Sequence, residues 1–293
     1  MHRPEATTLI DLLDRGGVAV DGGVRFVDRD ESATWFGWGE IRAQAEAVAA
    51  GLSKLGLARG ERVGLVFPTC PEFFAAFFGT LLAGAVPVPL YPPVRLGRLD
   101  EYLQRTARLL ESASARLVLA DGRVRRILGE AIAAARTPLG CKTLDALPHG
   151  SRPSREALDL TGADLALVQF SSGTTVEPKP AALSHRAVLA QVNALNTFWQ
   201  DTRETKHSCV SWLPLYHDMG LIGCVFPALA RDASLTLLGP ETFIGRPALW
   251  LRSLSRYRGT ISTAPNFGYA LCLSRIRDED MEGVDLSSWQ AAL

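Results

Sequence analysis

The chain has 293 residues, and its 31 Lys and Arg balance 31 Asp and Glu, so the formal net charge is zero. Neutrality gives no sign of a polyanionic partner, and the densest basic cluster, Arg123 with Arg125 and Arg126, is short and lacks interleaved aromatic residues. We therefore predict no nucleic-acid binding. A chain of this length can bury a substantial core in one large domain or two ordinary ones.

The five cysteines are widely spaced and form no C-x-x-C pair, which fits a reducing compartment better than a disulfide framework. The first eight residues lack the apolar run of a secretory signal. These two features predict a cytoplasmic protein.

Apolar residues recur at helical spacing from Ile41 to Leu55 and end at Gly56, which predicts a helix with a C-terminal glycine. The apolar run over 62–67 then predicts a buried strand.

No charged residue occurs from Phe73 to Val94, a length that could suggest a membrane span. Glycines and prolines interrupt it, so we prefer a buried helix over about 71–83, a stop at Gly84 and a buried strand over 85–90. Thr69, with Glu72 three residues later, predicts a capping box at the start of this helix. We therefore expect no transmembrane segment.

Helices and strands alternate through the rest of the chain, with the glycines and prolines of a linker over 137–163. Strands that are separated by helix-length segments favour parallel pairing with right-handed crossovers. The predicted fold class is therefore α/β, with layered parallel-sheet subdomains over 1–160 and 161–293. The predicted helices are 99–112, 124–135, 186–198, 219–230, 247–257 and 266–276, and the predicted strands are 116–120, 165–170, 181–183, 209–213, 235–238 and 260–263.

A hydroxyl-rich loop follows the apolar strand over 165–170. It contains Ser171, Ser172, Gly173, Thr174 and Thr175 and ends at Lys179. Hydroxyl and backbone N–H groups can surround phosphate oxygens while the ammonium group opposes their charge. The spacing is not that of the ordinary P-loop. From composition alone, a solvated connection between two elements is an equally good interpretation.

Three blocks, taken in order, resemble the adenylate-forming superfamily of acyl-CoA synthetases, luciferases and peptide-synthetase adenylation domains. The blocks are SSGTTVEPK at 171–179 with LSH at 183–185, WLPLYHDMGLIG at 212–223, and STAPNFGYAL at 262–271. The full second block, APNFGY, and VPLYPP at 88–93 are similar to the fatty acyl-AMP ligase branch. The resemblance runs over nearly the whole chain and implies the first part of the large N-terminal domain. The small C-terminal domain of the family, with its catalytic lysine, is expected to be absent from this chain.

Val176 and Pro180 depart from the family pattern, which has glycine at both places. A β-branched valine is strained at positive φ, and proline fixes φ and lacks an N–H donor. Either this subgroup shapes the loop differently or it binds nucleotide more weakly. We favour the first interpretation, because Lys179 and the loop hydroxyls are all present.

The resemblance implies that a fatty-acid carboxylate attacks the α-phosphate of ATP, with Mg²⁺, to give acyl-AMP and pyrophosphate. In this branch the acyl group then passes to the phosphopantetheine thiol of an acyl carrier protein. Ser171, Ser172, Gly173, Thr174, Thr175 and Lys179 would hold the phosphates. No metal ligand is assigned within the chain.

His217 lies between a strand-like run and a helix-like run. Taken alone, a histidine beside Asp218 is more simply a structural cap. The resemblance implies instead a catalytic role, in which His217 and Lys179 act on the substrate carboxylate and the phosphates. His185 is predicted to be structural.

Apolar residues near the second and third blocks are candidates for an acyl tunnel. Core packing would give the same helical spacing, so both interpretations stay open. The candidates are Met219, Gly220, Leu221, Ile222, Pro265, Asn266, Phe267 and Tyr269.

Two other functions remain open. One is a fatty acyl-CoA ligase of the same fold, in which coenzyme A replaces the carrier protein. The other is a non-catalytic acyl- or nucleotide-binding module, in which the altered loop no longer holds ATP productively.

Overall fold

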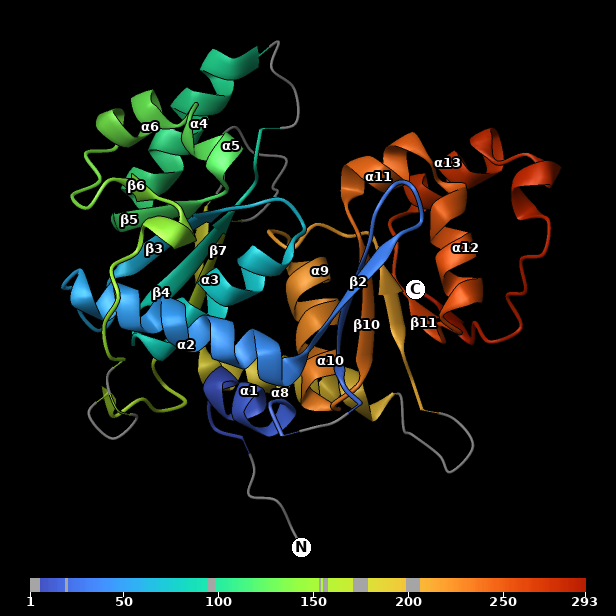
Figure 1. The fold of residues 1–293 in the computed structure, drawn as a ribbon, viewed down its shortest axis with the longest axis horizontal. Coiled ribbons are helices and arrows are strands. Elements are labelled where there is room, and N and C mark those ends of the chain that lie inside the picture. The colour runs from blue at the N-terminus through green and yellow to red at the C-terminus, as the bar shows by residue number, and fades with distance from the viewer. Residues whose placement is uncertain are drawn as a thin grey trace, which may run out of the picture. The chain divides into compact units, whose positions relative to one another are not determined.

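The computed structural model describes residues 6–18, 21–93, 98–152, 154, 158–170, 179–198 and 206–293. The chain forms two compact units, the first made of Met1–Asp11 with Ile41–Leu189 and the second of Leu12–Glu40 with Ala190–Leu293. Each unit contains a largely parallel sheet with helices, which confirms the predicted α/β class (Figure 1). The division into subdomains at residue 160 stays a prediction.

The first unit is built on a four-stranded parallel sheet with the order β4-β3-β5-β6. Its central strand, β3, is buried along four of its five residues, as expected for a strand covered on both faces. The sheet consists of β3 (Arg62–Val66), β4 (Val86–Leu90), β5 (Ala115–Ala120) and β6 (Cys141–Lys142). Its helices are α2 (Trp38–Lys54), α3 (Pro71–Leu82), α4 (Leu99–Ser112), α5 (Gly122–Arg125) and α6 (Gly129–Ala134), with a 3₁₀ turn at Leu144–Ala146.

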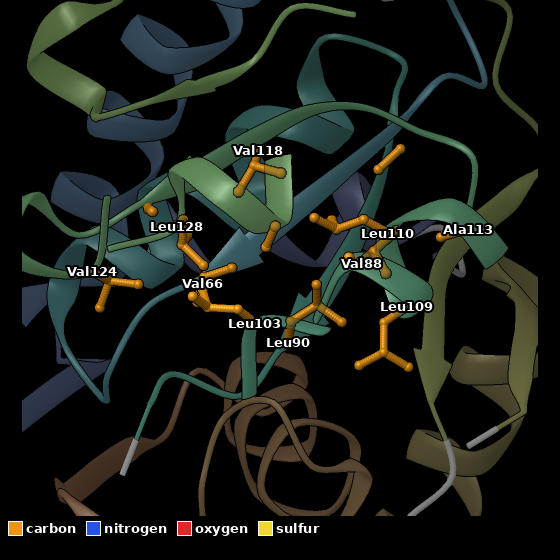
Figure 2. Close-up of a cluster of buried hydrophobic side chains, with 14 of the residues drawn as sticks. Val66, Val88, Leu90, Leu103, Leu109, Leu110, Ala113, Val118, Val124 and Leu128 are labelled. Carbon is orange, nitrogen blue, oxygen red and sulfur yellow. The ribbon is translucent and has the colours of Figure 1, made fainter. Parts of the chain in front are cut away.

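Helix α4 packs closely on this sheet, and their side chains form the cluster of Figure 2. Val66 and Val88 of the strands meet Leu103 and Leu110 of α4 in this cluster. Gly64 allows the close approach, because a Cβ atom there would lie 2.7 Å from Cδ2 of Leu110. Burial of these aliphatic side chains holds α4 to the sheet.

Helix α3 confirms the buried helix predicted over 71–83, and its end at Gly84, where φ is +79°, confirms the predicted stop. The predicted capping box is wrong, because the N-cap residue is Cys70 and no side chain caps the helix. Pro71 explains the difference, since its fixed φ and missing N–H favour the first helical position, one residue after Cys70. Across the described ranges, no helix is long and apolar enough to cross a membrane.

Strands β7 (Leu165–Phe170) and β8 (Pro180–Ser184) form an antiparallel pair in the first unit, and β7 runs beside β4. Phe170 pairs with Pro180, so the two ends of the predicted phosphate loop lie side by side. Pro180 occupies the first position of its strand, a place where a missing N–H donor is tolerated. Helix α8 (His185–Thr197) follows β8 directly.

The second unit is built on a six-stranded sheet with the order β12-β11-β9-β10-β1-β2, in which only β2 runs antiparallel to its neighbour. Helices α9 (Asp218–Gly220) and α10 (Phe226–Ala230) lie beside one face, and α12 (Ala248–Arg256) beside the other (Figure 1). The strands are β1 (Gly23–Val27), β2 (Ala33–Gly37), β9 (Cys209–Ser211), β10 (Ser234–Leu238), β11 (Ile261–Ser262) and β12 (Ala291–Ala292). Helix α1 (Leu9–Gly16) begins in the first unit and continues into the second. Further helices of the second unit are α11 (Pro240–Gly245), α12 (Ala248–Arg256), α13 (Asn266–Arg275) and a 3₁₀ turn at Asp278–Met281.

Two predicted elements are corrected. The helix predicted over 124–135 is two short helices, because the Asp121 carboxylate accepts from the N–H groups of Arg123 and Val124 and caps α5 early. The strand predicted over 209–213 ends at Ser211, since the chain turns before Pro214.

His185 links α8 to α1 within the first unit. Its side chain is fully buried, and Nδ1 accepts a hydrogen bond of 3.1 Å from the Leu9 N–H group. Burial lowers the pKa of His185 from 6.5 to about 4, partly opposed by the Asp164 carboxylate. The ring is therefore neutral in the folded protein at pH 7, as its predicted structural role requires.

This burial makes stability depend on pH. The folded pKa lies below that of the unfolded chain, so the unfolded chain takes up the proton first as pH falls. We expect the free energy of unfolding of the first unit to fall by about 2 kcal/mol between pH 7 and pH 4.5. Denaturant titrations at several pH values measure this loss. A His185→Asn variant should lose most of this pH dependence, whereas His149→Asn, at an exposed site, should keep it; equal slopes in both variants would contradict the assignment.

Candidate active site

The second motif, residues 212–223, belongs to one continuous segment of the second unit, which we call the wall because it borders the cavity described below. It leads from β9 through a turn into α9 (Asp218–Gly220), a π-helical segment (Leu221–Val225) and α10 (Phe226–Ala230). The helix predicted over 219–230 is therefore present but widened in its middle turn. The Phe226 N–H group donates to the Leu221 carbonyl, five residues back.

Pro227 explains the widened turn. Its nitrogen carries no hydrogen, so it cannot donate to the Gly223 carbonyl four residues back, and its ring would press on that carbonyl. A π turn moves the chain past this obstacle, and such turns are frequent at functional sites.

A cavity of about 440 Å³ lies against this wall, inside the second unit. Its surface is mainly apolar, which suits an alkyl chain better than a charged group. Met219, Ile222 and Gly223 line it from α9 and the π segment, and Leu195 lines it from α8. Cys209 and Ile261 contribute from the sheet.

The structure brings together two of the eight predicted acyl-tunnel residues, Met219 and Ile222, in this cavity. Gly220, Leu221, Pro265, Asn266, Phe267 and Tyr269 lie outside its lining. Phe267 packs its ring against Trp212, with centroids 5.6 Å apart, and is 56% exposed. The substrate role of all eight stays a prediction.

An aromatic cluster joins the second and third motifs. The Trp212 ring stacks on Phe243, with centroids 3.9 Å apart, and meets Trp250 edge-on. Gly268 lies against the same indole, because a Cβ atom there would be 2.6 Å from its ring. These contacts fix the turn after β9 relative to the start of α13.

The turn after β9 also depends on Gly220. A Cβ atom at this position would overlap the carbonyl oxygen of Pro214 and approach its carbon at 3.0 Å. Gly220 is therefore needed for backbone packing. Gly223 differs, since a Cβ atom there would find its nearest neighbour, Cγ of Met219, at 4.0 Å.

Asp218 caps α9 and pairs with His217. Oδ1 of Asp218 accepts from the Met219 N–H group at 2.8 Å and lies 2.6 Å from Nδ1 of His217. Nδ1 also lies 3.3 Å from the Met219 nitrogen, but one imidazole nitrogen cannot both donate and accept. The shorter contact decides, so Nδ1 carries a proton that it donates to Asp218.

The structural cap at the start of α9 is present, and Asp218 provides it. Oδ1 of Asp218 accepts the hydrogen bond that caps the helix, and His217 donates to this carboxylate through Nδ1. At the same time, Nε2 is the ring nitrogen through which His217 could reach a substrate. It accepts a hydrogen bond when the ring is neutral and donates one when the ring is protonated. A catalytic role for His217 stays a prediction.

The predicted phosphate loop falls mostly outside the described residues. This holds for Ser171, Ser172, Gly173, Thr174, Thr175 and Val176, whose roles stay predictions. Lys179 is described, exposed, and placed directly before β8. Lys179 belongs to the first unit and His217 to the second, so their approach to one substrate also stays a prediction.

Within the ranges that the structure describes, no three His, Cys, Asp or Glu side chains gather where they could hold a metal ion. Mg²⁺ commonly binds proteins through one or two carboxylates, several waters and the phosphates of a substrate. These residues therefore do not form a protein cage for Mg²⁺.

Sequence reasoning missed several residues of the cavity wall. Cys209, Cys224 and Thr263 line the cavity together with Asn196 of α8. Pro227 was the available signal, because a proline inside a predicted helix marks a local break in the hydrogen-bond ladder.

Residues 18–293 match the family model described as AMP-binding enzyme. JamA of Moorena producens, a medium-chain-fatty-acid–[acyl-carrier-protein] ligase, is 32% identical over 298 residues, which cover 100% of this chain and 50% of JamA. A protein of Caulobacter vibrioides named as an acyl-CoA synthetase is 31% identical over 285 residues, covering 97% of this chain and 49% of that protein. The chain spans about half the length of the curated relatives it matches.

Among solved structures, one from a study of fatty acyl-adenylate ligases of E. coli and L. pneumophila resembles this chain with a TM-score of 0.89. Its sequence is 33% identical, and the match covers 100% of this chain and 52% of that one. These likenesses confirm the resemblance to the fatty acyl-AMP ligase branch.

The two glycines of the wall provide a matched test of its packing. We expect Gly220→Ala to lower the free energy of unfolding by about 2 kcal/mol, because the new methyl group meets rigid backbone. Gly223→Ala should be neutral or stabilise by up to about 1 kcal/mol, since alanine favours helix and finds room. Urea denaturation of both variants measures the difference. Equal free energies of unfolding of the two variants would show that the backbone at Pro214 moves to make room for the new methyl group.

Proposed function

The chain belongs to the AMP-binding enzyme family, and on this basis we propose that the protein activates a fatty acid with ATP to form an acyl-adenylate and pyrophosphate. One observation carries the proposal: an apolar cavity of about 440 Å³ is lined by Asp218 and Met219, the two residues that follow His217 in the sequence. A fatty acid needs such a dry channel for its chain and a polar group at the mouth for its carboxylate. Because the relatives are about twice as long, we further propose that these 293 residues alone do not complete the reaction.

The main physical requirement of this reaction is that negative charge be neutralised. A carboxylate oxygen must bond to the α-phosphorus while the bond to the pyrophosphate oxygen breaks, and both partners are anions. We assign Lys179 and the hydroxyls over 171–175 to the β- and γ-phosphates, where the ammonium group offsets their charge. Mg²⁺ bound with the nucleotide would supply further neutralisation of these charges.

His217 would act at the mouth of the cavity. With Nδ1 bonded to Asp218, Nε2 is the nitrogen that donates to the carboxylate or the α-phosphate once the ring is protonated. A protonated ring also places a positive charge beside two anions. Asp218 orients the ring and does not touch the substrate in this scheme.

We propose that the acyl group passes next to the phosphopantetheine thiol of an acyl carrier protein. JamA, which is a medium-chain-fatty-acid–[acyl-carrier-protein] ligase, supports this acceptor. The Caulobacter relative, named as an acyl-CoA synthetase, supports coenzyme A as the rival. Thioester formation in a chain of the relatives' length, measured with each acceptor alone, separates the two.

A non-catalytic binding module remains the other candidate, because Val176 and Pro180 replace glycines of the family pattern. Calorimetry with ATP and with a nonhydrolysable acyl-adenylate distinguishes a module from an enzyme. An enzyme of the relatives' length binds both and exchanges pyrophosphate into ATP. Binding without exchange would favour the module.

Lys179 provides the first test of the nucleotide site. We expect Lys179→Ala to weaken ATP binding about tenfold, or about 1.4 kcal/mol, because one charge-assisted contact is lost. Lys206→Ala is the control, since this side chain is 85% exposed and lies in the second unit. Calorimetric titration with ATP measures both. Equal affinities of the two variants would remove Lys179 from the phosphate site.

Gly223 provides the test of the acyl cavity. Gly223→Leu places an isobutyl group in the cavity with no backbone in its way. We expect the longest acids to lose about tenfold or more in adenylation while short acids are unaffected, because only long chains reach the filled space. Gly245→Leu is the control, as no atom surrounds that position and it lies outside the cavity lining. Pyrophosphate exchange by a chain of the relatives' length, across a series of acid chain lengths, is the measurement, and an equal loss for every acid would contradict the placement.

A further inference from the structure

The cavity of the second unit follows the whole helical segment from α9 to α10. Asp218 and Met219 line it where this segment begins, and Arg231 lines it at the residue that follows α10. With a rise of about 1.5 Å per residue, the segment is about 20 Å long. The lining therefore extends from the end that carries His217 to a guanidinium group at the opposite end.

The residues that the sheet contributes show the same extent. Cys209 and Ile261 line the cavity from the first residues of β9 and β11, and Ala233 lines it just before β10. Thr263 lines it just after β11 ends. Because these strands are parallel, the cavity reaches from their carboxyl ends, where ligand sites of parallel sheets lie, to their amino ends.

Polar groups gather at the amino ends of the strands. The middle of the cavity is apolar, with Ile222, Pro227 and Ala228 along the helical segment. Arg231 lies past them, and the residues before β9 belong to the same end. We call this region the polar end, and its lining residues are Asn196, His207, Ser208 and Arg231.

Hydrogen bonds hold the polar end in place. Nη1 of Arg231 donates to the Asn196 carbonyl at 3.4 Å, and the Asn196 amide donates to the Pro227 carbonyl at 3.5 Å. Nδ1 of His207 lies 3.2 Å from the Thr260 hydroxyl. A guanidinium group has five N–H donors, so Arg231 can bond to a substrate oxygen in addition to its protein partners.

These groups would treat two kinds of acid differently. A methyl group that reached the polar end would displace water and offer no hydrogen bond in return, which is unfavourable. A carboxylate or hydroxyl group would accept hydrogen bonds there, and a guanidinium group pairs especially well with a carboxylate. An oxygen group held in the apolar middle of the cavity would have no such partner.

We propose that the polar end recognises an oxygen group at the ω end of the acid, so that the substrate class is long acids with an oxygen function at both ends. Arg231 is the residue that determines this specificity. The inference rests on the proposed function, because it takes the reacting carboxylate to lie at the end of the cavity that carries His217.

Calorimetric titration of the 293-residue chain tests this inference without ATP. The ligands are methyl-ended fatty acids, ω-hydroxy fatty acids and α,ω-dicarboxylic acids, matched in length. In short acids the ω oxygen should weaken binding, because it stays in the apolar middle. In acids that span about 20 Å it should strengthen binding about tenfold, by the added hydrogen bonds. The hydroxyl and carboxylate series show which oxygen group is preferred.

Arg231→Met should remove this preference among long acids and leave the affinity for methyl-ended acids within about twofold of the native value. Arg275→Met is the control, because Arg275 is exposed on α13 and lies outside the cavity lining. It should keep the preference. If Arg231→Met does not fold, the reversal with chain length in the native protein decides alone.

The outcomes separate this inference from the proposed function. An ω oxygen that weakens binding or leaves it unchanged at every length would overturn the inference, whereas binding of the methyl-ended acids would still support fatty-acid activation. A preference for oxygen that survives in folded Arg231→Met would remove Arg231 from the recognition. Failure of every acid to bind would overturn both.

Discussion

The close contact between Gly220 and the carbonyl of Pro214 is the constraint on which the candidate site depends. It brings the first turn of α9 against the turn that leaves β9, so no side chain can stand between them. His217 and Asp218 then fall at the junction of strand and helix, where the Met219 N–H group donates to Oδ1 of Asp218. The same junction determines the position at which α9 begins to line the cavity.

The widened turn behind this junction follows from a different residue. Pro227 breaks the regular ladder, and the bond from Phe226 to Leu221 spans five residues as a result. Because the π turn contains one additional residue, the helical residues before it are rotated about the helix axis relative to α10. Cys224 reaches the same surface as Cys209 in this arrangement, together with Ile222 and Gly223. Packing of Asn196 on α8 supports it, since its side-chain amide donates to the Pro227 carbonyl at 3.5 Å.

The sequence predicted most of the regular elements because their signals are local. Apolar spacing and a glycine stop were enough for α2, α3 and β4, and the α/β class followed from their alternation. The hairpin of β1 and β2 and helix α1 were missed, since no motif drew attention to the first forty residues. Burial of β1 depends on its partner β10, which lies more than two hundred positions away in the sequence. Such pairing cannot be inferred from either segment alone.

The site was predicted unevenly for a similar reason. The motifs indicated His217, Met219 and Ile222, because these stand in recognisable order along the chain. The cavity itself is a product of tertiary packing, in which β9 and β11 each contribute one residue and α8 contributes three. Gly220 shows how a motif residue can mislead, since its role in the wall is backbone clearance and a neighbouring glycine, Gly223, borders the open space. A motif therefore identifies the segment that builds a site, and only the packing around it distinguishes the residues that shape the backbone from those that face a ligand.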